Sequence, residues 1–197
     1  MHPLRLVRAA VAASVALALL AGCSAAVAGS PAAGDAPARA QRQAPVTDSA
    51  ELTDADGYIP DGSSLALDSD RPAVTRLDPQ LRSALDDAAA SAERERGIPI
   101  TIADGWRSER YQEYLFAQAV QKYGSEEEAL RWAKRGSDSE HVAGRAVDIA
   151  TADAMDFLSR FGSEWGLCQR YANESWHFEL LAEPGGQCPA PAPDGRG

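Results

Sequence analysis

The sequence predicts an α+β domain, a small antiparallel sheet with helices packed on one side. Three observations lead to this prediction. Apolar residues recur at helical spacing in several segments, and in short segments between them they alternate at every second position. Glycines and helix-capping residues separate the two kinds of segment.

The first predicted helix lies between Asp78, a residue type that caps helix N-termini, and Gly97, which ends helices. Pro79 takes the first helical position, where no backbone N–H is needed. The apolar face of this helix comprises Leu81, Leu85, Ala88 and Ala92.

The second predicted helix follows the cap residue Ser108 and ends at Gly124, with Tyr111, Leu115 and Ala119 along one side.

Two more helices are predicted. The third begins at the acidic capping box 125–128, where negative side chains meet the positive end of the helix dipole, and closes at Gly136. The fourth covers 153–161 and ends at Gly162.

Strands are predicted for segments 98–103, 145–150, 166–171 and 175–181. The alternation is clearest in the first of them, where Ile98, Ile100 and Ile102 point to one face.

Residues 1–22 are predicted to be a lipoprotein signal peptide. Arg5 and Arg8 give a positively charged start, and residues 9–21 form an apolar run too short for a relaxed membrane-spanning helix. Small residues precede Cys23, as in the lipidation motif of bacterial lipoproteins; an ordinary secretory signal with a chance cysteine is the alternative. We therefore expect an exported protein, lipid-anchored through Cys23 to the outer face of the bacterial cytoplasmic membrane and facing the cell wall.

The rest of the chain divides by composition. Residues 23–50, rich in Ala, Pro and Gly, are predicted to be a flexible tether. Residues 51–188 are predicted to form the domain, with residues 51–74 as an extended lead-in. Residues 189–197 are predicted to be a disordered tail.

The chain is acidic, with 19 Lys and Arg residues against 29 Asp and Glu residues and a net charge of −10. A protein that binds nucleic acid through its phosphates needs clustered cations, so no nucleic-acid partner is expected. We expect a monomer.

Only His141 and His177 remain once the predicted signal peptide is removed. Asp148 follows His141 by seven residues, within a predicted strand, and His177 lies on the strand expected to return beside it. Two imidazoles and a carboxylate are a typical ligand set for catalytic zinc, with one coordination position left open. The alternative is that the two histidines are unrelated polar residues.

Three motifs resemble the VanY-type D-alanyl-D-alanine carboxypeptidases, zinc peptidases related to the VanX-type dipeptidases and to the Hedgehog fold. The pattern Ser-x-His-x-x-Gly-x-Ala-x-Asp occupies residues 139–148, and Glu-x-Trp-His occupies 174–177. Gly-Trp-Arg-Ser at 105–108, followed by Gln112, resembles a third family segment. The resemblance covers about residues 75–182 in the family's order.

This resemblance implies that His141, Asp148 and His177 hold zinc. It implies that Glu174 is the general base and that Arg107 stabilises the oxyanion. A solvated surface acid is the alternative for Glu174, and a structural salt bridge is the alternative for Arg107.

The resemblance also implies that Ser139 and Gln112 bind the terminal carboxylate or the backbone of the substrate, with loop and helix capping as the alternative. Two departures affect the expected rim of the pocket. Trp106 stands where the family often has Tyr, and residues 136–138 lack the prolines often found there.

Cys168 and Cys188 are expected to form a disulfide, because leftover cysteines in an exported protein usually pair. Free buried thiols and zinc ligation are the alternatives.

The resemblance implies a zinc-dependent hydrolase that removes the terminal D-Ala from peptidoglycan stem peptides. One alternative is an endopeptidase that cleaves L,D or cross-bridge bonds with the same zinc site. The other is an inactive, zinc-stabilised lipoprotein that binds the cell wall.

Overall fold

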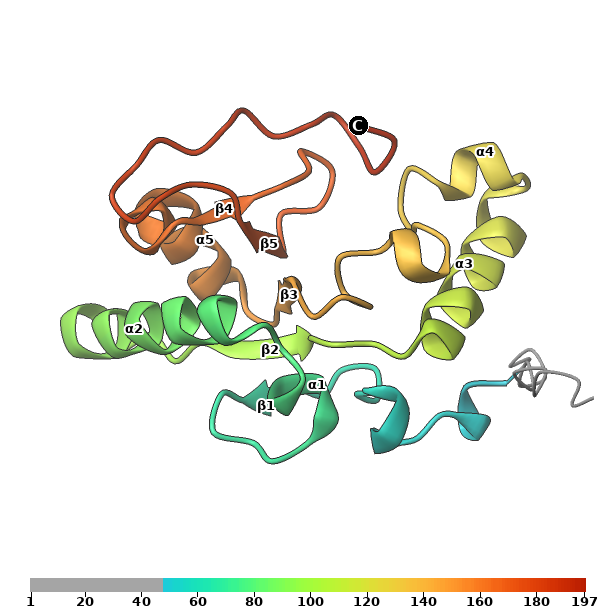
Figure 1. The fold of residues 1–197 in the computed structure, drawn as a ribbon, viewed down its shortest axis with the longest axis horizontal. Coiled ribbons are helices and arrows are strands. Elements are labelled where there is room, and N and C mark those ends of the chain that lie inside the picture. The colour runs from blue at the N-terminus through green and yellow to red at the C-terminus, as the bar shows by residue number, and fades with distance from the viewer. Residues whose placement is uncertain (1–47) are drawn as a thin grey trace, which may run out of the picture. The chain divides into compact units, whose positions relative to one another are not determined.

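The computed structural model describes residues 48–197 (Figure 1). The predicted signal peptide, Cys23 and almost all of the predicted tether lie outside the described residues. Among the residues that are described, we find no helix with the length and apolar character needed to cross a bilayer.

Five short strands form one antiparallel sheet in the order β1-β2-β3-β5-β4. They are β1 (Leu65–Ala66), β2 (Thr101–Asp104), β3 (Ala146–Ile149), β4 (Leu167–Gln169) and β5 (His177–Leu180). The last four lie in or overlap the predicted strand segments. The edge strand β1 comes from the lead-in, where no strand was predicted.

The α-helices are α1 (Pro72–Thr75), α2 (Pro79–Arg96), α3 (Glu109–Tyr123), α4 (Glu126–Ala129) and α5 (Ala152–Phe161). The caps of the two long helices are those that the sequence predicts. The Asp78 carboxylate accepts hydrogen bonds from the first backbone N–H groups of α2, and Ser108 does the same for α3. Together the sheet and helices confirm the predicted α+β class.

The third predicted helix is much shorter than expected, because α4 ends after one turn instead of reaching Gly136. Beyond it, the carbonyl of Arg131 accepts hydrogen bonds from Asn173 Nδ2 at 3.0 Å and from the Gly195 N–H at 3.1 Å. A continuing helix would need that carbonyl for its own ladder. Contacts with distant residues therefore replace the helix.

One face of the sheet packs against α2 and α5 and forms the main hydrophobic core. In Figure 1, α2 and α5 lie together on one side of the strands, whereas α3 and α4 lie together on the other side. The largest fully buried side chains of this core include Leu81, Leu85, Ile102, Ile149, Leu158 and Phe178.

The opposite face of the same strands is polar. In β5, Phe178 points into the core, so its neighbours His177 and Glu179 point to the other face. The register between β2 and β3 shifts, so that Asp104 faces Asp148. Such a bulge turns a side chain to a face that strict alternation would not give it.

The C-terminal segment is ordered, contrary to the prediction of a disordered tail. Ala192 accepts a hydrogen bond from the Ala172 N–H at 2.8 Å and donates one to the Arg170 carbonyl at 3.0 Å. The Asp194 carboxylate is buried and lies 3.0 Å from Arg131 Nε. Composition alone suggested disorder, whereas these nonlocal contacts hold the segment in place.

The predicted disulfide is confirmed. Cys168 on β4 is bonded to Cys188, with their Cα atoms 5.6 Å apart. A bridge with a sequence separation of 20 stabilises a fold by about 3 kcal/mol in the chain-entropy model.

Candidate metal centre

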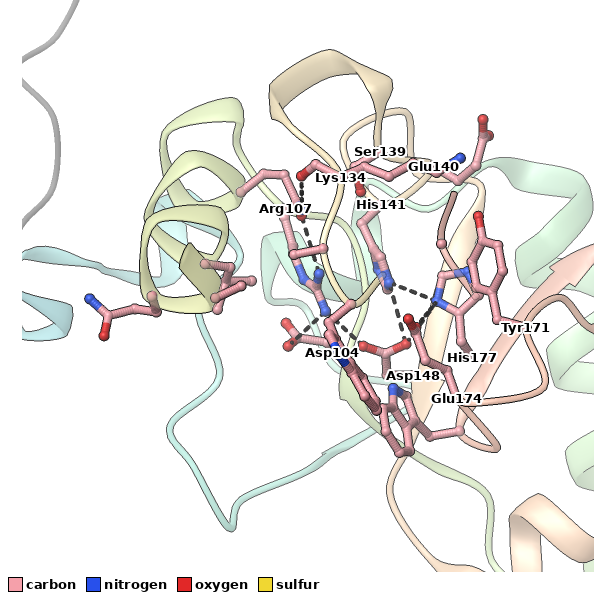
Figure 2. A pocket seen from close by; sticks show the side chains of 18 of the residues that line it. Asp104, Arg107, Lys134, Ser139, Glu140, His141, Asp148, Tyr171, Glu174 and His177 are labelled. Atoms are coloured by element: carbon pink, nitrogen blue, oxygen red, sulfur yellow. Dashed lines mark hydrogen bonds and ion pairs between the residues drawn. The ribbon is translucent and has the colours of Figure 1, made fainter. Parts of the chain in front are cut away.

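Three buried side chains converge on one point of the polar face (Figure 2). His141 Nε2 lies 3.2 Å from His177 Nδ1 and 3.3 Å from Asp148 Oδ1, and His177 Nδ1 lies 3.1 Å from the same Asp148 oxygen. The structure therefore brings together the three residues that the sequence predicts as metal ligands.

The spacing fits a tetrahedral ion. Ligands about 2.0–2.1 Å from a tetrahedral zinc lie about 3.3–3.4 Å from one another, close to the edges of this triangle. All three ligands border a cavity of about 400 Å³, so there is open space beside the triangle for a further ligand. Two imidazoles and one carboxylate with an open position are the donor set of catalytic zinc sites.

Hydrogen bonds behind the imidazoles decide which nitrogens are free. His141 Nδ1 lies 2.8 Å from the Gly105 carbonyl, and His177 Nε2 lies 3.0 Å from Glu179 Oε1. A neutral imidazole has one N–H, and both rings donate it away from the centre. In the neutral rings the remaining lone pairs face the Asp148 carboxylate, an arrangement that a bound cation, or a second proton on one ring, would stabilise.

Glu179 is a residue that the sequence analysis missed. It is buried, with 6% of its surface exposed, and it lies two positions after His177 on the same face of β5. An acid at that spacing within a predicted strand is the signal that could have revealed it. Glu179 orients the ring of His177 rather than facing the open side of the centre.

The loop that carries His141 is held by its backbone. Gly144 has φ of 72°, and a Cβ there would lie 2.4 Å from the Arg76 carbonyl, so only glycine fits. Its carbonyl accepts the Asp78 N–H at 2.8 Å, which connects the loop to the start of α2.

Arg107 supports the metal ligands from behind. Its Nη2 donates to Asp148 Oδ2 at 2.7 Å and lies 3.1 Å from Asp104 Oδ2. Its Nη1 donates to Gln112 Oε1 at 3.2 Å, and the Gln112 amide donates to the Lys134 carbonyl at 2.7 Å. Both ends of the Gln112 amide are therefore used in hydrogen bonds within the protein.

The local field sets the protonation of the cluster. Burial opposes the charge of Asp148, but the two histidines and Arg107 outweigh it and hold the Asp148 pKa well below its ordinary value. Burial and Arg107 lower the pKa of His141. Burial also opposes the charge of His177, but hydrogen bonds to Asp148 and Glu179 outweigh it and raise the His177 pKa to about 9. A metal ion that binds at His177 would release this proton.

Glu174 lies beside the centre without joining the triangle. The turn before β5 places it, because the His177 N–H donates to the Glu174 carbonyl at 3.2 Å. Its Oε2 lies 3.9 Å from His177 Nδ1, and burial raises the Glu174 pKa to about 7. A carboxyl group with that pKa can take up and give back a proton near neutral pH.

The other predicted residues line the same cavity. Ser139 is buried at its wall, as is Arg107, while Trp176 is half-buried at the cavity. The structure thus gathers every predicted metal, catalytic and substrate-binding residue around one cavity, although the roles of Ser139 and Gln112 remain predictions.

The comparisons with known proteins agree with this site. Residues 74–164 match the family model VanY, D-alanyl-D-alanine carboxypeptidase. The matched segment contains Arg107, His141 and Asp148, and it ends before Glu174 and His177, which the structure brings to the same centre. No curated protein matches the chain.

Several solved structures are similar to this chain. A vancomycin resistance D,D-pentapeptidase, VanY, solved as a point mutant with Zn(II), is 23% identical with a TM-score of 0.50, over 60% of this chain and 78% of that chain. VanYB in complex with D-alanine-D-alanine is 23% identical with a TM-score of 0.48, over 52% of this chain and 70% of the other. The LD-carboxypeptidase LdcB is 22% identical with a TM-score of 0.47, over 55% of this chain and 61% of the other. The first of them shares the fold.

The match of residues 74–164 to the VanY family model and the His141, Asp148 and His177 triangle together indicate a zinc metallopeptidase that is similar to the D-alanyl-D-alanine carboxypeptidases.

Proposed function

We propose that the protein is a zinc-dependent carboxypeptidase that removes the terminal D-Ala from peptidoglycan stem peptides. The observation that carries this proposal is the placement of Glu174 and Arg107 at one cavity with the three metal ligands. A site that only stabilised the fold would need no acid of raised pKa facing the open side. The Zn(II) of the similar VanY structure supports the choice of metal.

The residues divide the reaction between them. Zinc, when bound, polarises the scissile carbonyl and lowers the pKa of a water molecule to about 7. Glu174 accepts a proton from the attacking water, because its carboxylate lies 3.9 Å from His177 Nδ1 and faces the cavity. The same carboxyl group then donates the proton to the leaving amine of D-Ala.

Arg107 contributes charge and position. Its Nη2 donates a hydrogen bond to Asp148 and forms an ion pair with Asp104, so its first effect is to hold the Asp148 carboxylate in place. The guanidinium also lines the cavity, where its positive charge favours the negative oxygen that develops in the transition state.

The decisive experiment is mass spectrometry of defined muropeptides after digestion with the full chain, with and without a chelator. The proposal predicts loss of one D-Ala from pentapeptide stems and no reaction after exhaustive chelation. Cleavage inside the peptide would establish an endopeptidase, and intact muropeptides with zinc bound to the protein would favour the inactive alternative. Activity that survives chelation would refute the metal mechanism.

We also propose that the protein acts outside the cytoplasmic membrane, anchored through acylated Cys23. The apolar run before Cys23 in the sequence supports this location. Fatty-acid labelling should be lost in Cys23→Ala, and unchanged labelling would refute the anchor.

A further inference from the structure

The chain contains only two lysines, Lys122 and Lys134, and both line the cavity of the metal centre. The other cations of the chain are arginines and histidines, distributed over many elements. Lysines are therefore concentrated at the one place where a substrate would bind.

The lysines are the charged groups of the cavity without an opposite charge beside them. Asp104 and Asp148 lie beside Arg107. Glu140 Oε2 lies 2.6 Å from Arg145 Nε, and Glu179 is hydrogen-bonded to His177. Glu174 faces His177. Among the described residues, no carboxylate lies within ion-pair distance of the two lysines.

Lys134 is the better anchored of the two. Its carbonyl accepts the hydrogen bond from Gln112 at 2.7 Å, and its side chain is half-buried. Its Nζ lies 5.8 Å from the centroid of the Tyr171 ring, and that ring lies 5.2 Å from the ring of His177. Figure 2 shows Lys134 at the same end of the cavity as Ser139 and His141.

We propose that the ammonium group of Lys134 binds a carboxylate of the peptide substrate and so determines which peptides are cleaved. This inference rests on the proposed function. Arg107 is a poor competitor for that role, because its guanidinium group donates hydrogen bonds to Asp148 and Gln112 and forms an ion pair with Asp104. An unpaired ammonium in a cavity gains a charge-assisted hydrogen bond when a carboxylate arrives.

Two carboxylates of a peptide have this chemistry. One is the C-terminal carboxylate of the residue to be released, and the other is an acidic side chain before the cleaved bond. The test uses two matched pairs of peptides ending in D-Ala-D-Ala. In the first pair, one peptide ends in a free carboxylate and the other in an amide. In the second pair, a residue upstream of the cleaved bond carries the Glu side chain in one peptide and the Gln side chain in the other.

The measurement is the ratio of kcat/KM for acid over amide in each pair, for the full chain and for Lys134→Met. The ratio of one pair should fall by at least about tenfold in the variant, because the ammonium that favours the acid peptide over its amide is gone. The pair whose ratio falls identifies the carboxylate. Lys134→Arg should restore most of the ratio. Equal ratios in the two proteins for both pairs would overturn the proposal.

Arg160→Met is the matched control, because Arg160 is an exposed cation on α5, outside the cavity. Both ratios should stay unchanged in this variant. If the full chain cleaves none of the peptides, the proposed function is refuted, and the proposal for Lys134 is tested separately. The role of Lys134 is then decided by calorimetry with the same peptides, where Lys134→Met should weaken binding of one acid peptide and not of its amide.

Discussion

The two faces of the sheet are built from the same strands but are held by different forces. The face toward α2 and α5 consists of apolar side chains that exclude water, and their attraction has little dependence on direction. The face with His141, Asp148 and His177 consists of polar groups that must meet at defined distances. The residues that stabilise the fold and the residues of the metal centre therefore lie on opposite faces of one sheet.

Adjacent residues of β5 show the consequence. Phe178 is fully buried in the core, whereas His177 and Glu179 belong to the metal centre. A substitution at one of these positions should change one property and spare the other. Three predictions test this separation, from the largest expected effect to the smallest.

The largest effect is expected for Glu174→Gln. The amide cannot accept a proton from water, so kcat/KM should fall by about 10²–10⁴-fold. Zinc content, measured by elemental analysis, and the free energy of unfolding should stay close to those of the unchanged protein. Loss of zinc would instead make Glu174 a metal ligand.

The pH dependence of the unchanged protein is the control for this variant. Burial raises the Glu174 pKa to about 7, and only the ionised carboxylate can act as a base. The value of kcat/KM should therefore rise with pH and fall about tenfold per pH unit below the Glu174 pKa, which a bound cation would lower from 7. This acidic limb should be absent in Glu174→Gln; its persistence would assign the limb to another group.

An effect of similar size, but on stability, is expected for Phe178→Ala. Removal of the buried ring leaves a cavity in the core and should lower the free energy of unfolding by about 3–5 kcal/mol. Urea denaturation measures this loss. Molecules that remain folded should bind zinc with unchanged affinity, and a weakened affinity would mean that the two faces are coupled.

The smallest of the three effects is expected for Glu179→Ala. His177 would lose the acceptor for its Nε2 hydrogen, and zinc affinity should fall by about 10–100-fold. Glu179→Gln keeps an acceptor oxygen and should lose less. Competition with a chelator of known affinity measures both variants. An unchanged affinity in the alanine variant would show that Glu179 does not orient His177.

Much of the fold could be predicted from the sequence, because helix signals are local. Asp78, Ser108 and the glycines after the long helices act within one turn, and the structure has α2 and α3 within the predicted limits. The length of α4 and the order of residues 189–197 could not be predicted. Both depend on hydrogen bonds to the Arg131 region from residues distant in the sequence.

The candidate site divides in the same way. The metal ligands could be predicted because the chain beyond the predicted signal peptide has so few histidines, and because their motifs resemble a known family. Asp104 could not be predicted, since a bulge in β2 turns it toward Asp148. Lys134 could not be predicted either, because its place at the cavity depends on the loop that replaces the end of the third predicted helix.

The sequence by itself determined the kinds of chemical group available, namely a few imidazoles, many carboxylates and guanidinium groups, and two lysines. Only the tertiary structure decided which of their atoms face one another. Hydrogen bonds and metal coordination act over about 2–3 Å and depend on direction, so strand register and distant backbone contacts settle them. Apolar packing tolerates small shifts in direction, and for this reason its pattern was visible in the sequence alone.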